Sequence, residues 1–186
     1  MRIVGGEASG RKLRAPTGRT TRPTSDQVRE AIFNILYGLQ DIEGADVVDL
    51  FAGSGALGIE ALSRGAAHAT FVESDHHALT AIRDNLESTG MADRATVVRS
   101  DVLRWVADAP AFAVAFVDPP YAFSAWDELL DHLTVELAVL ESGRAFSLPG
   151  TWRAVRDKRY GTTVVTLARP RGADGGEQDR PDTGLV

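Results

Sequence analysis

A short apolar segment followed by three closely spaced glycines is the feature that most restricts the fold of this chain. Residues 46–51 are largely apolar, Gly53, Gly55 and Gly58 follow them, and residues 56–64 continue with helical character. Glycines at this spacing allow a strand to turn tightly into a helix and allow that helix to pack closely on the strand. The pattern therefore predicts a strand–loop–helix unit of a parallel sheet.

The alternation of strands and helices continues along the chain. Strands are predicted over residues 46–51, 69–73, 96–99 and 113–117, and helices over 56–64, 75–88, 102–107 and 124–140. Because the strands are nearly all apolar and helices separate them, we expect parallel strands with helices on both faces. The fold class predicted is α/β, with a doubly wound, mostly parallel sheet.

The N-terminal part of the chain differs from this pattern. Residues 1–23 contain β-like pieces at 2–4 and 12–14 and predict a small basic hairpin arm outside the core. Thr24 and Gln27 have the spacing of a capping box, so a helix is expected to begin there.

The C-terminal part has weaker signals. Residues 145–148 could form one short strand, and residues 162–168 predict a final strand. Residues 170–186 lack periodicity and predict a disordered tail. The main domain is therefore expected to span residues 24–169.

Composition excludes several classes of protein. The 186 residues suit one domain, and the absence of cysteine excludes disulfides and thiolate metal sites. With only four histidines, we expect no metal. No apolar run approaches the roughly 20 residues of a membrane helix, and no apolar signal segment opens the chain. We expect a cytoplasmic monomer without a membrane partner.

Positive charge is concentrated in two places, although the net charge is -6. Residues 1–30 carry seven basic and three acidic side chains, and a second basic cluster lies within 153–159. Local basic patches are what phosphate contacts require, although a solvated basic surface without a partner would have the same composition. The candidate RNA-binding residues are Arg2, Arg11, Lys12, Arg14, Arg19, Arg22, Arg29, Arg156, Lys158 and Arg159.

The glycine loop also matches the fingerprint of a nucleotide cofactor. Glu73 lies 20 residues after Gly53, at the end of the next predicted strand, which is the pattern of dinucleotide-binding proteins. An NAD-dependent enzyme is therefore one hypothesis. Asp49 favours another, because a carboxylate beside this turn would repel a pyrophosphate. It would instead attract the α-ammonium group of S-adenosylmethionine, whose ribose also needs an acid such as Glu73.

Asp101 follows the third predicted strand and is placed to accept a hydrogen bond from the adenine N6 of that cofactor. A helix N-cap is the alternative role for this aspartate. The cofactor-binding candidates at this edge of the sheet are Asp49, Phe51, Gly53, Ser54, Gly55, Ala56, Glu73, Ser74, Asp101 and Val102.

The catalytic candidates are the tetrapeptide Asp118-Pro119-Pro120-Tyr121, which ends the fourth predicted strand. The exocyclic amine of a base is a poor nucleophile because its lone pair is delocalised into the ring. The Asp118 carboxylate and the Pro119 carbonyl could accept its two hydrogens and free that lone pair, while Tyr121 stacks on the base. A proline strand terminator with a core tyrosine is the alternative.

These motifs resemble those of the RsmD family of 16S rRNA guanine-N2 methyltransferases. The resemblance runs over roughly residues 1–170, and its most specific part is residues 21–34, TRPTSDQVREAIFN. It includes RIVGG at the N-terminus, the loop 49–58, FVE at 71–73, the tetrapeptide 118–121 and KRYG at 158–161.

The resemblance implies a class I methyltransferase (Rossmann-like) sheet with an N-terminal β-hairpin extension and S-adenosyl-L-methionine as cofactor. It implies a guanine of 16S rRNA as target, within the small ribosomal subunit or its assembly intermediate. It also implies that residues 22–26 fold over the cofactor cleft, which adds Thr24 and Ser25 to the cofactor-binding candidates.

One departure from the family is expected. Relatives carry a long apolar strand after the helix that follows the tetrapeptide, whereas residues 140–150 look compressed here, so a shortened strand and a thinner sheet edge are predicted. Three other functions stay open: an adenine-N6 methyltransferase acting on DNA or RNA, an NAD-dependent enzyme, and a non-catalytic RNA-binding assembly factor.

Overall fold

A computed structural model of the chain describes residues 1–17, 25–144 and 146–172. Its strands are β1 (Asp46–Leu50), β2 (His68–Glu73), β3 (Ala95–Arg99), β4 (Phe112–Val117), β5 (Val135–Ser142), β6 (Trp152–Tyr160) and β7 (Thr163–Pro170). Its helices are α1 (Asp26–Tyr37), α2 (Ala56–Ser63), α3 (His76–Thr89), α4 (Val102–Val106) and α5 (Trp126–His132), with a short 3₁₀ turn η1 (Ala92–Arg94).

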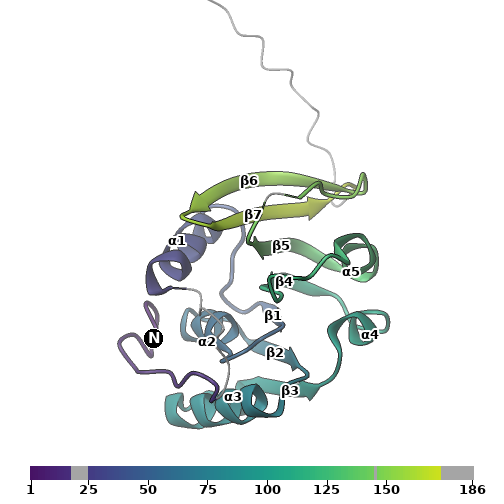
Figure 1. Cartoon of the computed structure of the whole chain (residues 1–186). Coiled ribbons are helices and arrows are strands. Elements are labelled where there is room, and N and C mark those ends of the chain that lie inside the picture. Colours follow the sequence, from purple (N-terminus) through teal and green to yellow (C-terminus); the bar gives the residue numbers. More distant parts are fainter. Residues whose placement is uncertain (18–24, 145, 173–186) are drawn as a thin grey trace, which may run out of the picture.

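The seven strands form one sheet of order β3-β2-β1-β4-β5-β7-β6. The five strands from β3 to β5 in this order run parallel, and β7 and β6 complete the sheet with antiparallel pairings. Helices α1, α2 and α3 cover one face, and α4 and α5 cover the other (Figure 1). The predicted doubly wound α/β fold is confirmed. The order reverses between β1 and β4, which is where open α/β sheets bind ligands.

Strand β5 corrects two predictions. Residues 124–140 are not one helix, because α5 ends at His132 and β5 spans Val135–Ser142. An apolar run buried between two strands has no period that separates it from a buried helix, so the pattern alone was insufficient. The long apolar strand is therefore present after the tetrapeptide, and the shortened strand predicted at 140–150 is wrong.

The sequence pattern also missed the edge strand β6, whose outward residues are mostly charged and whose register shifts between Ala154 and Arg156. Residues 146–148 are not a strand, and residue 145 lies outside the described residues. The final strand is confirmed as β7. Helix α1 is capped by Ser25, whose hydroxyl accepts the Val28 N–H, rather than by Thr24, which lies outside the described ranges.

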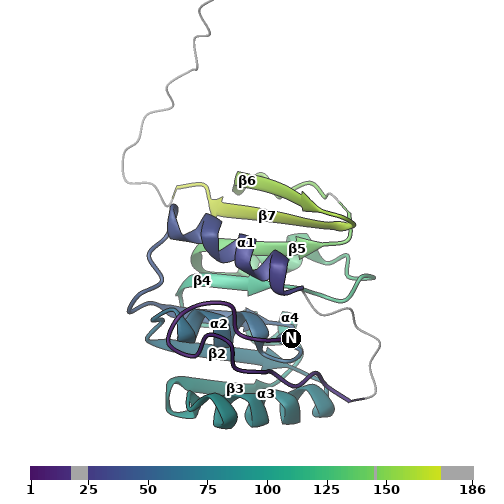
Figure 2. The same ribbon diagram turned by 90° about the vertical axis from the view of Figure 1, so that its left-hand side faces the viewer.

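The N-terminal arm packs into the core instead of lying outside it. Its two limbs pair through an isolated antiparallel bridge between Arg2 and Lys12 rather than through strands. Ile3, Ala8 and Leu13 are buried in the core cluster beneath it. In Figure 2 the arm lies over α2, between α1 and α3. The expectation of a peripheral arm is wrong because these apolar side chains cover the outer side of α2.

Helix α2 is buried along its whole length and holds the arm with polar side chains. The carboxylate of Glu60 accepts the backbone N–H groups of Val4 and Gly5, each at 2.8 Å. The same carboxylate accepts Nε of Arg64 at 2.8 Å and lies 3.4 Å from Nε of Arg29. A buried charge needs such pairing to offset its lost hydration. Glu60 therefore joins the arm, α1 and α2 in one network.

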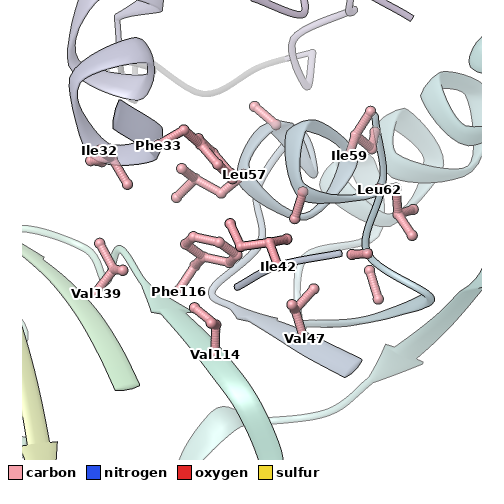
Figure 3. Close-up of a cluster of buried hydrophobic side chains, with 14 of the residues drawn as sticks. Ile32, Phe33, Ile42, Val47, Leu57, Ile59, Leu62, Val114, Phe116 and Val139 are labelled. Atoms are coloured by element: carbon pink, nitrogen blue, oxygen red, sulfur yellow. The ribbon is translucent and has the colours of Figure 1, made fainter. Parts of the chain in front are cut away.

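The apolar core between α1, α2 and the sheet positions the site from below (Figure 3). Phe33 of α1 and Phe116 of β4 lie with their ring centroids 5.4 Å apart. Val139 of β5 and Leu57 of α2 complete the contact between the two layers (Figure 3). Asp118, two residues after Phe116, follows the end of β4 at the carboxyl edge of the sheet.

Replacing Glu60 with glutamine should destabilise the protein by about 3 kcal/mol, because a buried ion pair loses one partner while Arg29 keeps its second contact with Asp26. Urea unfolding followed by circular dichroism measures this change. Glu87→Gln, on the exposed surface of α3, is the matched control. Equal stabilities of the two variants would show that Glu60 does not join the arm to the core.

Candidate active site at the carboxyl edge of the sheet

Acidic side chains converge at the carboxyl ends of three neighbouring strands. Leu50 of β1 pairs with Val72 of β2 and with Val117 of β4. The next residues of the outer strands, Glu73 and Asp118, therefore flank the end of β1 on its two sides. Asp49 lies just below them and is only 2% exposed.

The pKa of Asp49 depends on its burial and on its two charged neighbours. Burial raises the pKa of its carboxyl well above the usual range, and the charges of Asp118 and Glu73 raise the pKa further, while the Gly58 N–H opposes them. The Gly58 N–H donates to Asp49 Oδ2 at 2.9 Å. Three carboxylates at one sheet edge disfavour an anionic ligand and favour a cationic one.

The glycine loop has the geometry that its sequence predicts. Gly53 and Gly55 have φ of 57° and 76°, in the left-handed region that favours glycine. Gly58 is required by space instead, because a Cβ there would lie 2.4 Å from the ring of Phe71. The loop therefore brings α2 into close contact with the sheet beside Asp49.

Glu73, at the end of β2, accepts a hydrogen bond from the backbone of this loop. Its Oε2 accepts the Gly53 N–H at 3.0 Å, and its Oε1 accepts the N–H groups of Ser74 and Asp75 at 2.7 and 2.9 Å. The carboxylate is buried, and these backbone donors supply the hydrogen bonds that its oxygens need there. Glu73 therefore fixes the relative position of two loops at the edge.

Phe51 is the one non-glycine residue with positive φ (59°) in the described ranges 1–17, 25–144 and 146–172. Such a backbone is rare for an aromatic residue and costs on the order of 1–3 kcal/mol. Its ring lies edge-on to Phe123, with centroids 5.1 Å apart, and Phe123 contacts Trp126 in the same way at 5.2 Å. The aromatic contacts hold Phe51 in this conformation between the glycine loop and the tetrapeptide.

The remaining cofactor candidates divide between two roles. Asp101 is exposed and caps α4, because its Oδ1 accepts the Arg104 N–H at 3.2 Å. The N-cap alternative is thus the role that this carboxylate has in the structure, although the residue still lies at the edge. Val102 and Ala56 are buried at the starts of their helices, and Ser54 presents its carbonyl to Asn85 Nδ2 at 2.9 Å.

The tetrapeptide 118–121 leaves β4 and turns back at once, since the Phe123 N–H donates to the Pro120 carbonyl at 2.8 Å. Tyr121 is 82% exposed, which contradicts the alternative of a core tyrosine. Its ring lies against Gly143 after β5, where a Cβ would come within 2.2 Å of the ring. Sequence reasoning missed Gly143, because only the fold brings the two segments together.

A pocket of about 170 Å³ lies between the tetrapeptide and the segment that follows β5. Pro119, Tyr121 and Ser142 line its rim, and Trp126 and Phe146 stack on each other at its wall, with centroids 4.2 Å apart. The Ser142 hydroxyl is buried and makes no hydrogen bond to the residues that the structure describes. The pocket thus combines aromatic surface with a polar group close to the tetrapeptide.

The basic candidates do not all lie on the surface. Arg29 is fully buried and donates to the Arg2 carbonyl and to Asp26 at 2.8 Å, so its prediction as an RNA contact is wrong. Its charge is used inside the protein to balance Glu60. Arg2, Arg11, Lys12 and Arg14 are on or near the surface of the arm, and Arg156, Lys158 and Arg159 are exposed on β6.

Some candidates cannot be placed. Arg19, Arg22 and Thr24 lie outside the described residues, and Ser25 uses its hydroxyl to cap α1.

In the described ranges no group of three or more His, Cys, Asp or Glu side chains could hold a metal ion. None of the helices there is long and apolar enough to cross a membrane.

Comparison with known proteins agrees with this architecture. A family model described as "Conserved hypothetical protein 95" matches residues 1–169. Ribosomal RNA small subunit methyltransferase D of Escherichia coli strain K12 is 42% identical over 180 residues, which cover 90% of this chain and 88% of that protein. The chain belongs to the RsmD family.

Other members extend the similarity. The enzyme of the same name from Haemophilus influenzae is 32% identical over 180 residues, covering 90% of this chain and 92% of that protein. The solved structure of YhhF from Escherichia coli superposes with a TM-score of 0.79 at 36% identity, over 91% of this chain and 97% of that one. The fold of this RsmD-family chain is therefore the class I methyltransferase, Rossmann-like fold.

The raised pKa of Asp49 predicts a pH-dependent cost of the buried charge. The pKa of Asp49 in the folded protein lies above its ordinary value of 3.8. The folded state therefore binds the proton more tightly than the unfolded state. This contribution to the free energy of unfolding is complete below pH 3.8 and is lost as the pH rises through the folded pKa. The free energy of unfolding of Asp49→Asn should therefore exceed that of the unchanged protein by an amount that grows from pH 4 to pH 8. Urea titrations across this range measure it.

Asp131→Asn, on the exposed side of α5, controls for the loss of one negative charge. A difference between Asp49→Asn and the unchanged protein that stays constant with pH would contradict the burial of a costly carboxylate at this edge.

Proposed function

We propose that this chain transfers a methyl group from S-adenosyl-L-methionine to the exocyclic N2 amine of a guanine in 16S rRNA. The observation that carries the proposal is the position of the tetrapeptide 118–121 beside the buried Asp49 and Glu73, in a chain of the RsmD family. The relative from Escherichia coli is named for methylation of small-subunit ribosomal RNA.

The acidic edge suits this cofactor. Bound S-adenosyl-L-methionine supplies an electrophilic methyl group on a sulfonium, and its amino-acid end carries a cationic ammonium. Asp49 is the buried carboxylate that would accept the ammonium, which relieves the repulsion from Asp118 and Glu73. This electrostatic preference separates the site from an NAD site, where a pyrophosphate would meet the same carboxylates.

Glu73 and Asp101 would hold the adenosine. Oε2 of Glu73 accepts the Gly53 N–H. A carboxylate oxygen can accept a second hydrogen bond, so it could also accept a ribose hydroxyl while it keeps the bond to Gly53. Asp101 uses Oδ1 to cap α4, and its second oxygen would accept the adenine N6 amine. Phe51, Gly53, Ser54, Gly55, Ala56, Ser74 and Val102 would form the surrounding walls.

The tetrapeptide would activate the target amine. The Asp118 carboxylate and the Pro119 carbonyl accept the two hydrogens of N2, which draws the nitrogen towards tetrahedral geometry. The nitrogen lone pair would then attack the methyl group that bound S-adenosyl-L-methionine supplies, and the C–S bond electrons would leave with sulfur. Asp118 is placed to take the proton that N2 loses. Tyr121, held against Gly143, stacks on the base.

The rRNA would contact the exposed basic residues of the arm and of β6. Arg11 and Lys12 lie on the arm, and Arg156, Lys158 and Arg159 lie on β6. Phosphate contacts of this kind give affinity without base specificity. The partner proposed is the small ribosomal subunit or its assembly intermediate, the location is the cytoplasm, and the protein acts as a monomer.

Methyl transfer to small subunits that lack the modification tests the proposal. Radiolabelled S-adenosyl-L-methionine should label their 16S rRNA, and mass mapping should place the label on the N2 of one guanine. Asp118→Ala should abolish turnover while calorimetric affinity for S-adenosylhomocysteine stays within about tenfold. Asp127→Ala, exposed on α5, should behave as the unchanged protein.

Other outcomes separate the alternatives. Methylation of duplex DNA or of an adenine, without labelling of the small subunit, would favour an adenine-N6 enzyme. Binding of NAD in place of S-adenosylhomocysteine would favour a dehydrogenase. Turnover unchanged by Asp118→Ala would return this residue to a structural role at the end of β4.

Gly143→Ala tests the stacking role of Tyr121 without altering that residue. The new Cβ would lie 2.2 Å from the ring, so the ring must move. Because base stacking on an aromatic side chain contributes about 1–3 kcal/mol, kcat/KM for the subunit should fall by roughly five- to 140-fold. Calorimetric affinity for S-adenosylhomocysteine should not change.

Gly150→Ala is the matched control, since, apart from its chain neighbours, none of the residues that the structure describes lies within 4 Å of a Cβ at that position. A Gly143→Ala variant as active as this control would show that the ring position does not matter for the reaction.

A further inference from the structure

Glu141 lies beside Asp118 at the carboxyl edge of the sheet. Val117 of β4 pairs with Leu140 of β5 in a parallel register. Neighbouring strands are about 4.8 Å apart, so the next residues, Asp118 and Glu141, begin side by side. Glu141 is 4% exposed although it is charged, which is uncommon for a glutamate.

The side chain of Glu141 points to the same face as Asp49. Its partner in β7 is Val165, which belongs to the core cluster on the face of α1 and α2, whereas its neighbour Leu140 belongs to the cluster on the opposite face. Side chains alternate along a strand, so Glu141 faces the α1 side. Asp118 influences the pKa of Asp49, which also faces α2 through its bond to Gly58.

The tetrapeptide alone does not select the base, because both guanine and adenine present an exocyclic amine. The two bases differ in the ring atom next to that amine. In guanine N1 carries a hydrogen and donates, whereas in adenine N1 is an acceptor. A flipped base is read along this edge by hydrogen bonds. A carboxylate next to Asp118 would therefore accept from guanine and repel adenine.

We propose that Glu141 selects guanine by accepting its N1–H while Asp118 holds the neighbouring N2 amine. The inference rests on the proposed guanine-N2 reaction and names the residue that distinguishes it from adenine-N6 methylation. Both carboxylates also engage another group of the protein. A carboxylate has about four acceptor positions on two oxygens, so Glu141 can keep that partner and accept N1–H.

The pair of carboxylates, Asp118 and Glu141, matches a base that presents two neighbouring hydrogen-bond donors. Like charges on neighbouring strand ends raise each other's energy, and donors placed between them lower it. The N1–H and N2–H groups of guanine supply donors to both carboxylates. The edge of adenine supplies a donor to one and a lone pair to the other.

The test compares guanine with 2-aminopurine at the target nucleotide, in small subunits reconstituted with each 16S rRNA. 2-Aminopurine keeps the 2-amino group and has no hydrogen on N1. The unchanged protein should prefer guanine by at least tenfold in kcat/KM. Glu141→Gln should lower kcat/KM for guanine ten- to a hundredfold, and the preference should fall towards one, because an amide can also donate to N1.

Glu136→Gln is the matched control, since it makes the same change at an exposed position near the other end of β5. It should leave both rates and their ratio unchanged. Affinity for S-adenosylhomocysteine should be the same in all variants. If Glu141→Gln does not fold, Glu141→Asp keeps the charge and should retain the preference for guanine at a lower rate.

The outcomes separate this inference from the proposed function. An unchanged protein that labels no guanine N2 would overturn the proposed function itself. Labelling of guanine N2 with a preference that Glu141→Gln leaves intact, whether or not both rates fall together, would overturn only the role of Glu141. Loss of the preference in Glu141→Asp would also contradict it, since the acceptor charge remains.

Discussion

The convergence of carboxylates at the ends of β1, β2 and β4 is the constraint on which the site depends. The parallel register places Glu73 and Asp118 on either side of β1, above the buried Asp49. Burial raises the pKa of Asp49 well above its usual range, and the charges of Asp118 and Glu73 raise it further. Backbone N–H groups of the glycine loop donate hydrogen bonds to the buried carboxylates of Asp49 and Glu73. Acidic side chains gathered at one edge repel an anionic ligand, which is why the proposed cofactor carries a cationic group.

Helix α2 links this edge to the rest of the fold. Its inner side brings Gly58 against the ring of Phe71, which sets the loop beside Asp49. Its outer side holds the N-terminal arm through Glu60, which balances the buried Arg29. A helix buried on both sides cannot shift without disturbing the core or the loop. The arm therefore stabilises the position of the glycine loop, in addition to the contact with RNA proposed for it.

The proposed reaction divides its requirements among segments that are distant in the sequence. The tetrapeptide 118–121 supplies the chemistry for an amine on a planar base, and Gly143 positions its tyrosine by leaving room for the ring. Glu141, one strand away, would supply the choice of base. An active site built from the ends of adjacent parallel strands can change its specificity at one strand while the others keep the chemistry.

Sequence alone determined the features that depend on local geometry: the tight glycine loop, the alternation of strands and helices, and the position of the tetrapeptide 118–121 at the end of a strand. It failed where tertiary contacts decide. The apolar pattern of residues 135–140 is compatible with a buried helix and with a buried strand. Only their position between β4 and β7 makes them part of β5. The sequence predicts Arg29 as a surface cation, but its guanidinium is buried beside the carboxylate of Glu60 in α2. Partners that lie far apart in the chain meet only after folding, so the environments of Arg29 and Glu141 belong to the tertiary structure.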